Sequence, residues 1–334
     1  LGAIPAIWLA GRGGNRPGVP LLAPAVLFFG LTCLGPAIAS SQSTLSVSLV
    51  VVGASSAMLD VLMNAATSGY EAVQRVRRMH LAHAIYSAGV FVGSVSAGLL
   101  RQERVPYTAI LIGCMALILA SALLARRPRD VAVTAHHHGR TTARSTMSPV
   151  LLGLGALCAV AFVLEQGMEL WSALHLERDL QAPPAIAGLG PGLLALSAVA
   201  GRLTGQALAE RVSEPVLLAC AGTAAALGVA DFALAPSWSV ALPGLLLSGS
   251  GVSIAAPTML GLAGRFAGPA RRGSTVSTVA LIGYVGFLVG PLYLGALSEV
   301  LGLRLALLSL TSCALIFGWG GLALVADLGR GRTA

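Results

Sequence analysis

Charged residues are scarce in this chain. They make up 10% of its 334 residues, whereas hydrophobic residues make up 56%. A soluble domain carries roughly 25% charged residues, so the composition excludes an ordinary soluble protein. A helix needs about 20 consecutive apolar residues to cross a bilayer, and several runs approach or exceed that length. The chain is therefore predicted to be an all-α polytopic membrane protein with ten spans, near residues 21–40, 45–69, 80–100, 107–125, 149–175, 185–208, 215–235, 239–263, 274–298 and 303–326.

Lysine is absent, and all 21 basic residues are arginines. The net charge of +8 could indicate nucleic-acid binding, but the arginines stand mainly in short turns between apolar runs. Alternating the loops across the membrane puts sixteen arginines on one side and four on the other, with Arg202 inside a run. Arginine-rich loops stay in the cytoplasm, so the first side is predicted to be cytoplasmic. We expect a lipid bilayer as the surroundings and no nucleic acid as a partner.

Other motifs are missing too. Five cysteines lie one per apolar run without paired spacing, which argues against a disulfide or zinc framework. The sequence has no phosphate-binding P-loop and no catalytic constellation, so we expect neither an ATP-driven pump nor an enzyme, and no cofactor. His136, His137 and His138 have no carboxylate or cysteine beside them, and a solvated linker accounts for them better than a metal site. Leu1 begins no signal-peptide pattern.

Two short patterns recur at nearly the same spacing, which predicts two tandem halves of similar topology. Three glycines recur at an offset of 197, and we expect them to pack helices closely: Gly89, Gly93 and Gly98 match Gly286, Gly290 and Gly295. A polar loop recurs at an offset of 199: Leu9-Ala10-Gly11-Arg12 with Gly14 matches Leu208-Ala209-Glu210-Arg211 with Ser213.

The repeat also predicts the domains. We expect an incomplete N-terminal half over 1–125, a cytoplasmic linker over 126–148 and a C-terminal six-helix half over 149–334. Subtracting 199 from the start of the second half places the start of the first about fifty residues before Leu1. The first helix and part of the second are then missing, and LGAIPAIWLA is a stub that reaches about half the bilayer. The pattern is ten full spans plus a stub, in two halves of six.

This arrangement resembles the major facilitator superfamily, which marks the loop after the second helix of each half with a pattern like G-x-L-A-D-R-x-G-R-K. The resemblance implies gating loops at Gly11, Arg12, Gly14 and Arg16, and at Glu210 and Arg211. A second set of residues is similar to a bacterial group related to fucose permease: Gly53, Asp60, Asn64, Glu71, His83, Gly89 and Gly93, with Glu165, Trp171-Ser172 and Gly201-Arg202-Leu203. The family's E-G-x-x-x-D-W reads here as E-Q-G-M-E-L-W over 165–171.

Polar residues inside the apolar runs are candidates for a substrate and proton pathway. Asp60, Asn64 and Glu71 share one helical face, and a carboxylate in hydrocarbon costs several kcal/mol. That face should therefore line a protein interior or a water-filled path. Glu165 and Glu169 lie four apart, and two carboxylates in low dielectric let one hold an exchangeable proton. The full candidate set is Asp60, Asn64, Glu71, His83, Glu165, Glu169, Trp171 and Arg202.

Four of these candidates also have structural alternatives. Glu169 either exchanges a proton or lies close enough to the outer surface to be hydrated and to have no role in transport. Arg202 either snorkels to the interface or pairs with Glu165, Asp60 or an anionic substrate. His83 either couples proton load to gating or bonds to backbone at a helix end. Trp171 either stacks on a sugar ring or anchors its helix at the interface.

The leading hypothesis is a secondary carrier of a small sugar-like or drug-like solute. We expect it to be proton-coupled, monomeric and located in the bacterial cytoplasmic membrane, with access alternating between the two halves. The alternative is a membrane protein that transports nothing, such as a receptor or a truncated relic.

The topology is directly testable. Reporter fusions after Arg140 and after Arg178 should report opposite sides of the membrane, because one span separates these positions. Reporters on the same side would contradict the two-half arrangement.

Overall fold

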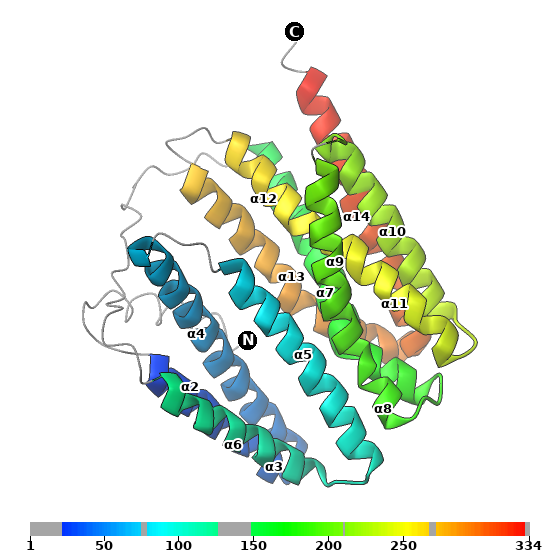
Figure 1. Cartoon of the computed structure of the whole chain (residues 1–334). Helices are drawn as coiled ribbons and strands as arrows, with labels where there is room; N and C mark the ends of the chain where they lie inside the picture. The colour runs from blue at the N-terminus through cyan, green and yellow to red at the C-terminus, as the bar shows by residue number, and fades with distance from the viewer. Residues whose placement is uncertain (1–21, 75–78, 126–147, 210, 267–271, 331–334) are drawn as a thin grey trace. The chain divides into compact units, whose positions relative to one another are not determined.

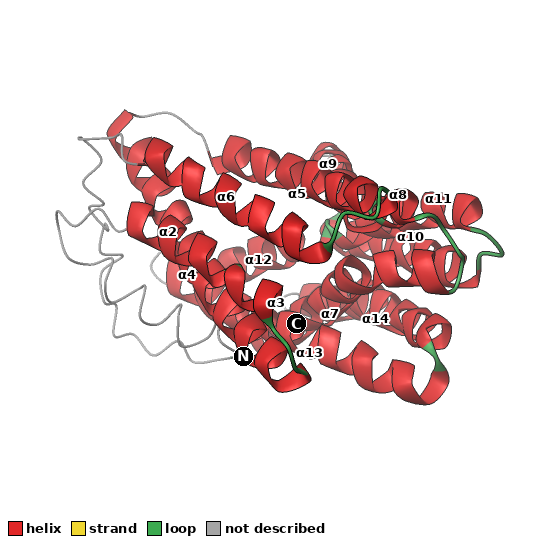
Figure 2. Ribbon diagram, turned by 90° about the horizontal axis from the view of Figure 1, so that it is seen from below, coloured by secondary structure: helices red, strands yellow, loops and turns green. Residues whose placement is uncertain are grey.

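The computed structural model describes residues 22–74, 79–125, 148–209, 211–266 and 272–330. Within these ranges the regular elements are helices, and no strand occurs (Figures 1 and 2). The all-α polytopic fold is therefore confirmed. The predicted stub at the start of the chain and the linker histidines, His136 to His138, lie outside the described residues.

Helices lie on all ten apolar runs, but the helix on the run 80–100, Met79–Gln102, is not among those apolar enough to count as a span. Seven helical stretches are long and apolar enough to cross a membrane, and Leu22–Ile38 and Tyr107–Ala122 are shorter apolar helices. In chain order the helices are α2 (Leu22–Thr32), α3 (Leu34–Ile38), α4 (Gln42–Gln74), α5 (Met79–Gln102), α6 (Tyr107–Ala125), α7 (Pro149–Arg178), α8 (Pro184–Ala187), α9 (Leu189–Ala209), α10 (Glu214–Leu234), α11 (Trp238–Val252), α12 (Ala255–Phe266), α13 (Arg272–Leu301) and α14 (Leu303–Arg330).

Three of the runs are broken helices. α2 and α3 are separated at Cys33, α8 and α9 at Gly188, and α11 and α12 at Ser253 and Ile254. Irregular backbone within a membrane is tolerated where other groups satisfy it. At the third break the backbone N–H groups of Ser253 and Ile254 donate to the carbonyls of Gly249 and Gly251 at 3.2 and 3.3 Å.

The chain forms two compact units. The first comprises residues 1–85 and 103–140, and the second comprises 86–102 and 141–334. The helix α5 is therefore divided between Ile85 and Tyr86. This division follows spatial contacts, whereas the predicted halves follow the sequence repeat and remain a prediction.

In the first unit, α2 lies against α4 and α6. A Cβ atom on Gly30 would lie 2.9 Å from Leu119 Cδ2, so the glycine lets α6 approach closely. The hydroxyls of Thr32 and Ser55 are 2.9 Å apart and link α2 to α4. Small residues and hydroxyl bonds hold these helices together, as expected where water does not drive association.

In the second unit, α7 and α10 are the central helices: α7 packs on α13 and α14, and α10 packs on α11 and α14. Ser148 caps α7 by accepting the N–H of Leu151, and Pro149 occupies the first turn, where it costs no hydrogen bond. A Cβ on Gly222 would lie 2.6 Å from the Ala314 carbonyl oxygen, so α10 and α14 touch through their backbones. Such contacts supply the dispersion energy that binds membrane helices.

The six glycines singled out by the repeat lie in different surroundings. A Cβ would fall 2.6 Å from Pro184 O at Gly98 and 2.8 Å from Val163 O at Gly290, and at Gly286 it would overlap the carbonyl oxygen of Ala159. At Gly295 it would meet a Trp171 side-chain atom at 3.5 Å, an ordinary contact. At Gly89 and Gly93 it would meet no described atom within 4 Å.

These contacts predict the cost of adding one methyl group. Gly286→Ala should lower the free energy of unfolding by about 1–3 kcal/mol, because the atoms that the added methyl group would meet belong to the backbone of Ala159 and cannot turn aside. Gly89→Ala is the matched control and should change stability by less than about 0.5 kcal/mol. Thermal unfolding of both purified variants measures the difference, and equal midpoints would contradict the close packing.

Candidate functional site

The middle of α7 carries a polar face that includes Glu165, Gln166 and Glu169. At 1.5 Å per residue a helix of this length spans about 45 Å, so Glu165, sixteen residues from its start, lies well inside the membrane. Residues three and four apart share a helical face, which brings the three side chains together. Glu165 and Glu169 are both partly buried.

Arg202 reaches this face from α9. Its guanidinium Nη2 lies 3.7 Å from Glu165 Oε1, with the two side chains 46% and 20% exposed. The preceding residue, Gly201, lets α9 lie against α11, because a Cβ there would overlap the carbonyl oxygen of Ser250. The structure thus brings Arg202 to Glu165, one of the partners that the sequence allowed. The 3.7 Å separation makes this an ion pair rather than a hydrogen bond.

Gln166 is a functional candidate that the sequence reasoning missed. Its amide Nε2 donates to Glu169 Oε2 at 3.0 Å. The signal that could have revealed it is the spacing of three residues, which places an amide and a carboxylate side by side on a helix. The two carboxylates of this face therefore have partners of different chemistry.

The first unit holds the other predicted pathway residues. Asn64 Nδ2 donates to Asp60 Oδ1 at 3.1 Å on α4, and Asp60 is exposed within its unit. The Thr67 hydroxyl bonds to the Met63 carbonyl of the same helix. Glu71 lies on α4 and His83 on α5, but their side chains are outside the described part of the structure.

Three aromatic rings lie beside the polar face of α7. Phe162, one turn before Glu165, stacks on Phe287 of α13 with centroids 4.2 Å apart. Tyr284 stands 5.8 Å from both rings. Trp171 is partly buried and packs on the hydrophobic core of this unit. The stack was not predicted, although the spacing of three between Tyr284 and Phe287 is a signal for it.

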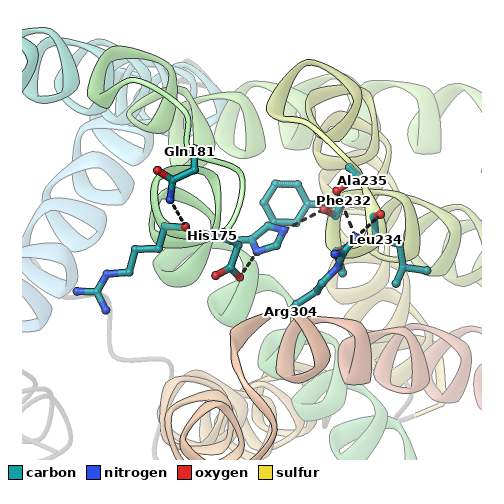
Figure 3. Close-up of polar contacts among 9 residues, drawn as sticks. His175, Gln181, Phe232, Leu234, Ala235 and Arg304 are labelled. Carbon is teal, nitrogen blue, oxygen red and sulfur yellow. Dashed lines mark hydrogen bonds and ion pairs between the residues drawn. The ribbon is translucent and has the colours of Figure 1, made fainter.

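The end of α7 that is predicted to face outward is fixed by polar contacts (Figure 3). His175 is fully buried, and its Nδ1 and Nε2 lie 2.8 Å from Asp179 Oδ2 and 3.2 Å from the Phe232 carbonyl oxygen. Arg304 of α14 donates to the carbonyls of Ala233 and Leu234 at 2.9 and 2.5 Å. These bonds satisfy carbonyl groups at the end of α10 that have no partner within the helix.

Two further ion pairs join helices near their ends. Arg101 of α5 makes a bidentate pair with Glu177 of α7, with both N–O distances at 2.7 Å. Arg265 of α12 pairs with Glu214 at the start of α10. Arg211, a predicted gating residue, is exposed after α9. The other predicted gating residues lie outside the described part of the chain, namely Gly11, Arg12, Gly14, Arg16 and Glu210.

The long apolar helices define a polytopic membrane protein. The family model described as Major Facilitator Superfamily matches residues 1–291 and 155–330, and the chain belongs to that superfamily. Its members move small solutes across membranes.

Two curated relatives are similar to this chain over most of its length. An uncharacterized MFS-type transporter of Yersinia pestis is 30% identical over 291 residues, covering 86% of this chain and 74% of that protein. The membrane protein MosC of Rhizobium meliloti is 28% identical over 269 residues, covering 80% of this chain. The alignment spans 65% of the length of MosC.

Solved structures support the same fold. An inward-facing, occupied bacterial homolog of the human lysosomal transporter Spinster has a TM-score of 0.70 and 18% identity, covering 97% of this chain and 85% of its own. The fucose:proton symporter FucP of E. coli has a TM-score of 0.57 and 16% identity, covering 96% and 87%. At these identities the similarity concerns the fold.

The Arg304 contacts yield a stability prediction. Arg304→Met keeps the aliphatic length but removes the donors, and should lower the free energy of unfolding by about 1.5–3 kcal/mol. Arg178→Met, at the exposed end of α7, is the control and should change it by less than about 0.5 kcal/mol. Thermal unfolding in detergent checks both, and an unchanged Arg304→Met midpoint would show that these bonds contribute nothing.

Proposed function

We propose that this protein is a secondary active transporter that moves a small solute in exchange for, or together with, protons. The observation that carries the proposal is the ion pair between Glu165 and Arg202 on membrane-spanning helices, with Glu169 one turn away. Burying charges costs several kcal/mol each unless they are paired, so such a cluster is rarely retained without a role.

A proton can change this cluster in a way that transport requires. Protonating one of the α7 carboxyl groups alters the net charge that faces Arg202. The electrostatic attraction between α7 and α9 then becomes weaker. A carboxyl group that is exposed to one side of the membrane at a time then couples proton movement to alternating access. Asp60 on α4 is proposed as the corresponding acid of the first unit.

The surroundings support a sugar-like or drug-like solute. The stack of Phe162, Phe287 and Tyr284 offers ring faces one turn from Glu165, and the carboxylates and the guanidinium of Arg202 offer polar partners. Binding sites typically combine apolar walls with a few such polar groups. FucP, a fucose:proton symporter, shares the fold.

The pair between Arg101 and Glu177 supports alternating access. It joins α5, from the predicted N-terminal half, to α7, from the C-terminal half, near ends that the arginine distribution predicts to face outward. A charge-assisted bidentate pair of this kind favours the state in which the two helix ends meet. We further propose a monomeric carrier in the bacterial cytoplasmic membrane. The alternative of a receptor or inactive relic is not favoured by the match to transporters.

Neutralising the acids tests the proposal. In vesicles that contain the full chain, candidate sugars and amphipathic drugs are first screened for substrate-dependent proton flux. Glu165→Gln and Asp60→Asn keep the size of the side chain but remove its charge. Glu165→Gln removes the charge that pairs with Arg202, and Asp60→Asn removes the acid of the first unit, so each should abolish proton-driven accumulation at matched expression, while substrate exchange is partly retained.

The control is Glu214→Gln, which removes an acid whose pair with Arg265 lies at a helix start. It should keep proton-driven accumulation. Full proton-coupled uptake by both Glu165→Gln and Asp60→Asn would overturn the role of these acids, and reduced protein yield with normal coupling would make them structural.

A further inference from the structure

The carboxyl groups of the candidate site differ in the chemistry of their partners. Glu165 faces a guanidinium, that of Arg202, at 3.7 Å. Glu169 accepts a hydrogen bond from an amide, that of Gln166, at 3.0 Å. Among the ion pairs formed by the described residues, none includes Glu169. This difference distinguishes the two acids, although both lie on one face of α7.

The two kinds of partner respond differently to a proton. A guanidinium has donors and no acceptor, so Arg202 can bind Glu165 well only while Glu165 is ionised. A side-chain amide has both a donor and an acceptor. Gln166 can donate its N–H to the ionised form of Glu169, and by turning its amide it can accept the O–H of the protonated form. Only the amide pair therefore stays hydrogen-bonded in both protonation states.

We infer that Glu169 is the α7 carboxyl that takes up and releases the proton, that Gln166 is its positioning residue, and that Glu165 serves as the partner of Arg202. The proton adds to a carboxylate oxygen of Glu169 from water on one side and leaves to water on the other, and no other bond is made or broken. The inference rests on the proposed function and assigns its proton to one named residue.

The groups around Glu169 are consistent with this assignment. On its own helix, the titratable residue one turn away is Glu165. Apart from α5, whose Arg101 pairs with Glu177 near the end of α7, the helices packed against α7 are α8, α9, α11, α12, α13 and α14. Their ionisable side chains in the described part of the chain are Arg202 on α9, Arg265 on α12, Tyr284, Tyr293 and Glu299 on α13, and Arg304 and Cys313 on α14. Arg202 is paired with Glu165, and Arg265 and Arg304 have the partners described above near helix ends.

The same arrangement occurs independently in the first unit. Asn64 donates its amide N–H to Asp60 at 3.1 Å, again one helical turn away. An acid and an amide on one turn of a membrane-spanning helix thus occur in each unit, in α4 and in α7. The partner type, rather than depth alone, distinguishes Asp60 and Glu169 from Glu165.

Infrared titration of the full chain in lipid vesicles tests the inference without a substrate. Protonated carboxyl groups give a carbonyl band that is separate from the bands of carboxylates. Difference spectra between the parent and Glu169→Gln should show one protonated carboxyl that appears as the pH falls. Glu165→Gln should retain that band, because the inference assigns the exchangeable proton to Glu169.

Gln166→Met tests the positioning role, because methionine keeps the length of the side chain but offers no amide. It should move the midpoint of the Glu169 band by about one pH unit toward higher pH, since the ionised form loses a charge-assisted donor. A merely structural role of Gln166 would lower thermal stability and leave the midpoint in place. Gln166→Asn, which keeps an amide on a shorter side chain, should recover part of the shift.

The opposite pattern overturns the inference. If the titrating band is lost in Glu165→Gln and kept in Glu169→Gln, the proton belongs to Glu165. If the midpoint is unchanged in Gln166→Met while the variant folds, Gln166 does not position the acid. Failure of the proposed function has a different signature, because it appears as absent proton-coupled flux in vesicles while the infrared titration is unaffected.

Discussion

The cost of a charge in low dielectric is the constraint on which this protein depends. Hydrocarbon accepts an ionised side chain only when a partner or water compensates it, so each acid within a span shapes the helices around it. Glu165 is met by Arg202 from α9, and Glu169 is met by Gln166 from its own helix. Arginines near the ends of helices have other partners: Arg304 donates to carbonyl groups at the end of α10, and Arg101 pairs with Glu177. Polar partners therefore connect helices whose remaining surfaces are apolar.

Those helices must approach closely before such partners can meet, and small residues allow it. Gly201 brings α9 into backbone contact with α11, and the next residue carries the guanidinium that reaches α7. Gly286 and Gly290 let α13 lie against α7, which places Phe287 on Phe162. The same glycines thus determine both how closely the helices pack and where the side chains of the candidate site lie. A larger side chain at any of these glycines would move a functional group as well as a helix.

Most of the fold could be predicted from the sequence, and the site only in part. The ten apolar runs were enough to predict where the helices lie, because hydropathy over about 20 residues is a strong signal. The breaks at Gly188 and Ser253 were not assigned, since glycine and serine are common in spans with or without a break. The pairing of Arg202 with Glu165 could be stated only as one of several options, because a contact between distant helices depends on packing. The stack of Phe162 on Phe287 was missed for the same reason, whereas Gln166 contacts Glu169 on its own helix and could have been found from the spacing of three residues.

The residues around Glu165 show how two small departures from a family pattern can act together. The pattern E-G-x-x-x-D-W has glycine after its first acid and its second acid five residues on. Here the glycine position is Gln166, and the acid lies at Glu169 instead of at Leu170. A shift of one residue turns a side chain by about 100° around the helix, since a turn takes 3.6 residues. Leu170 is exposed on the side of α7 away from its core, whereas position 169 lies four residues after Glu165 and three after Gln166. Neither departure alone would form the amide–carboxylate pair. The hydrogen bond between Gln166 and Glu169 therefore depends on both residues.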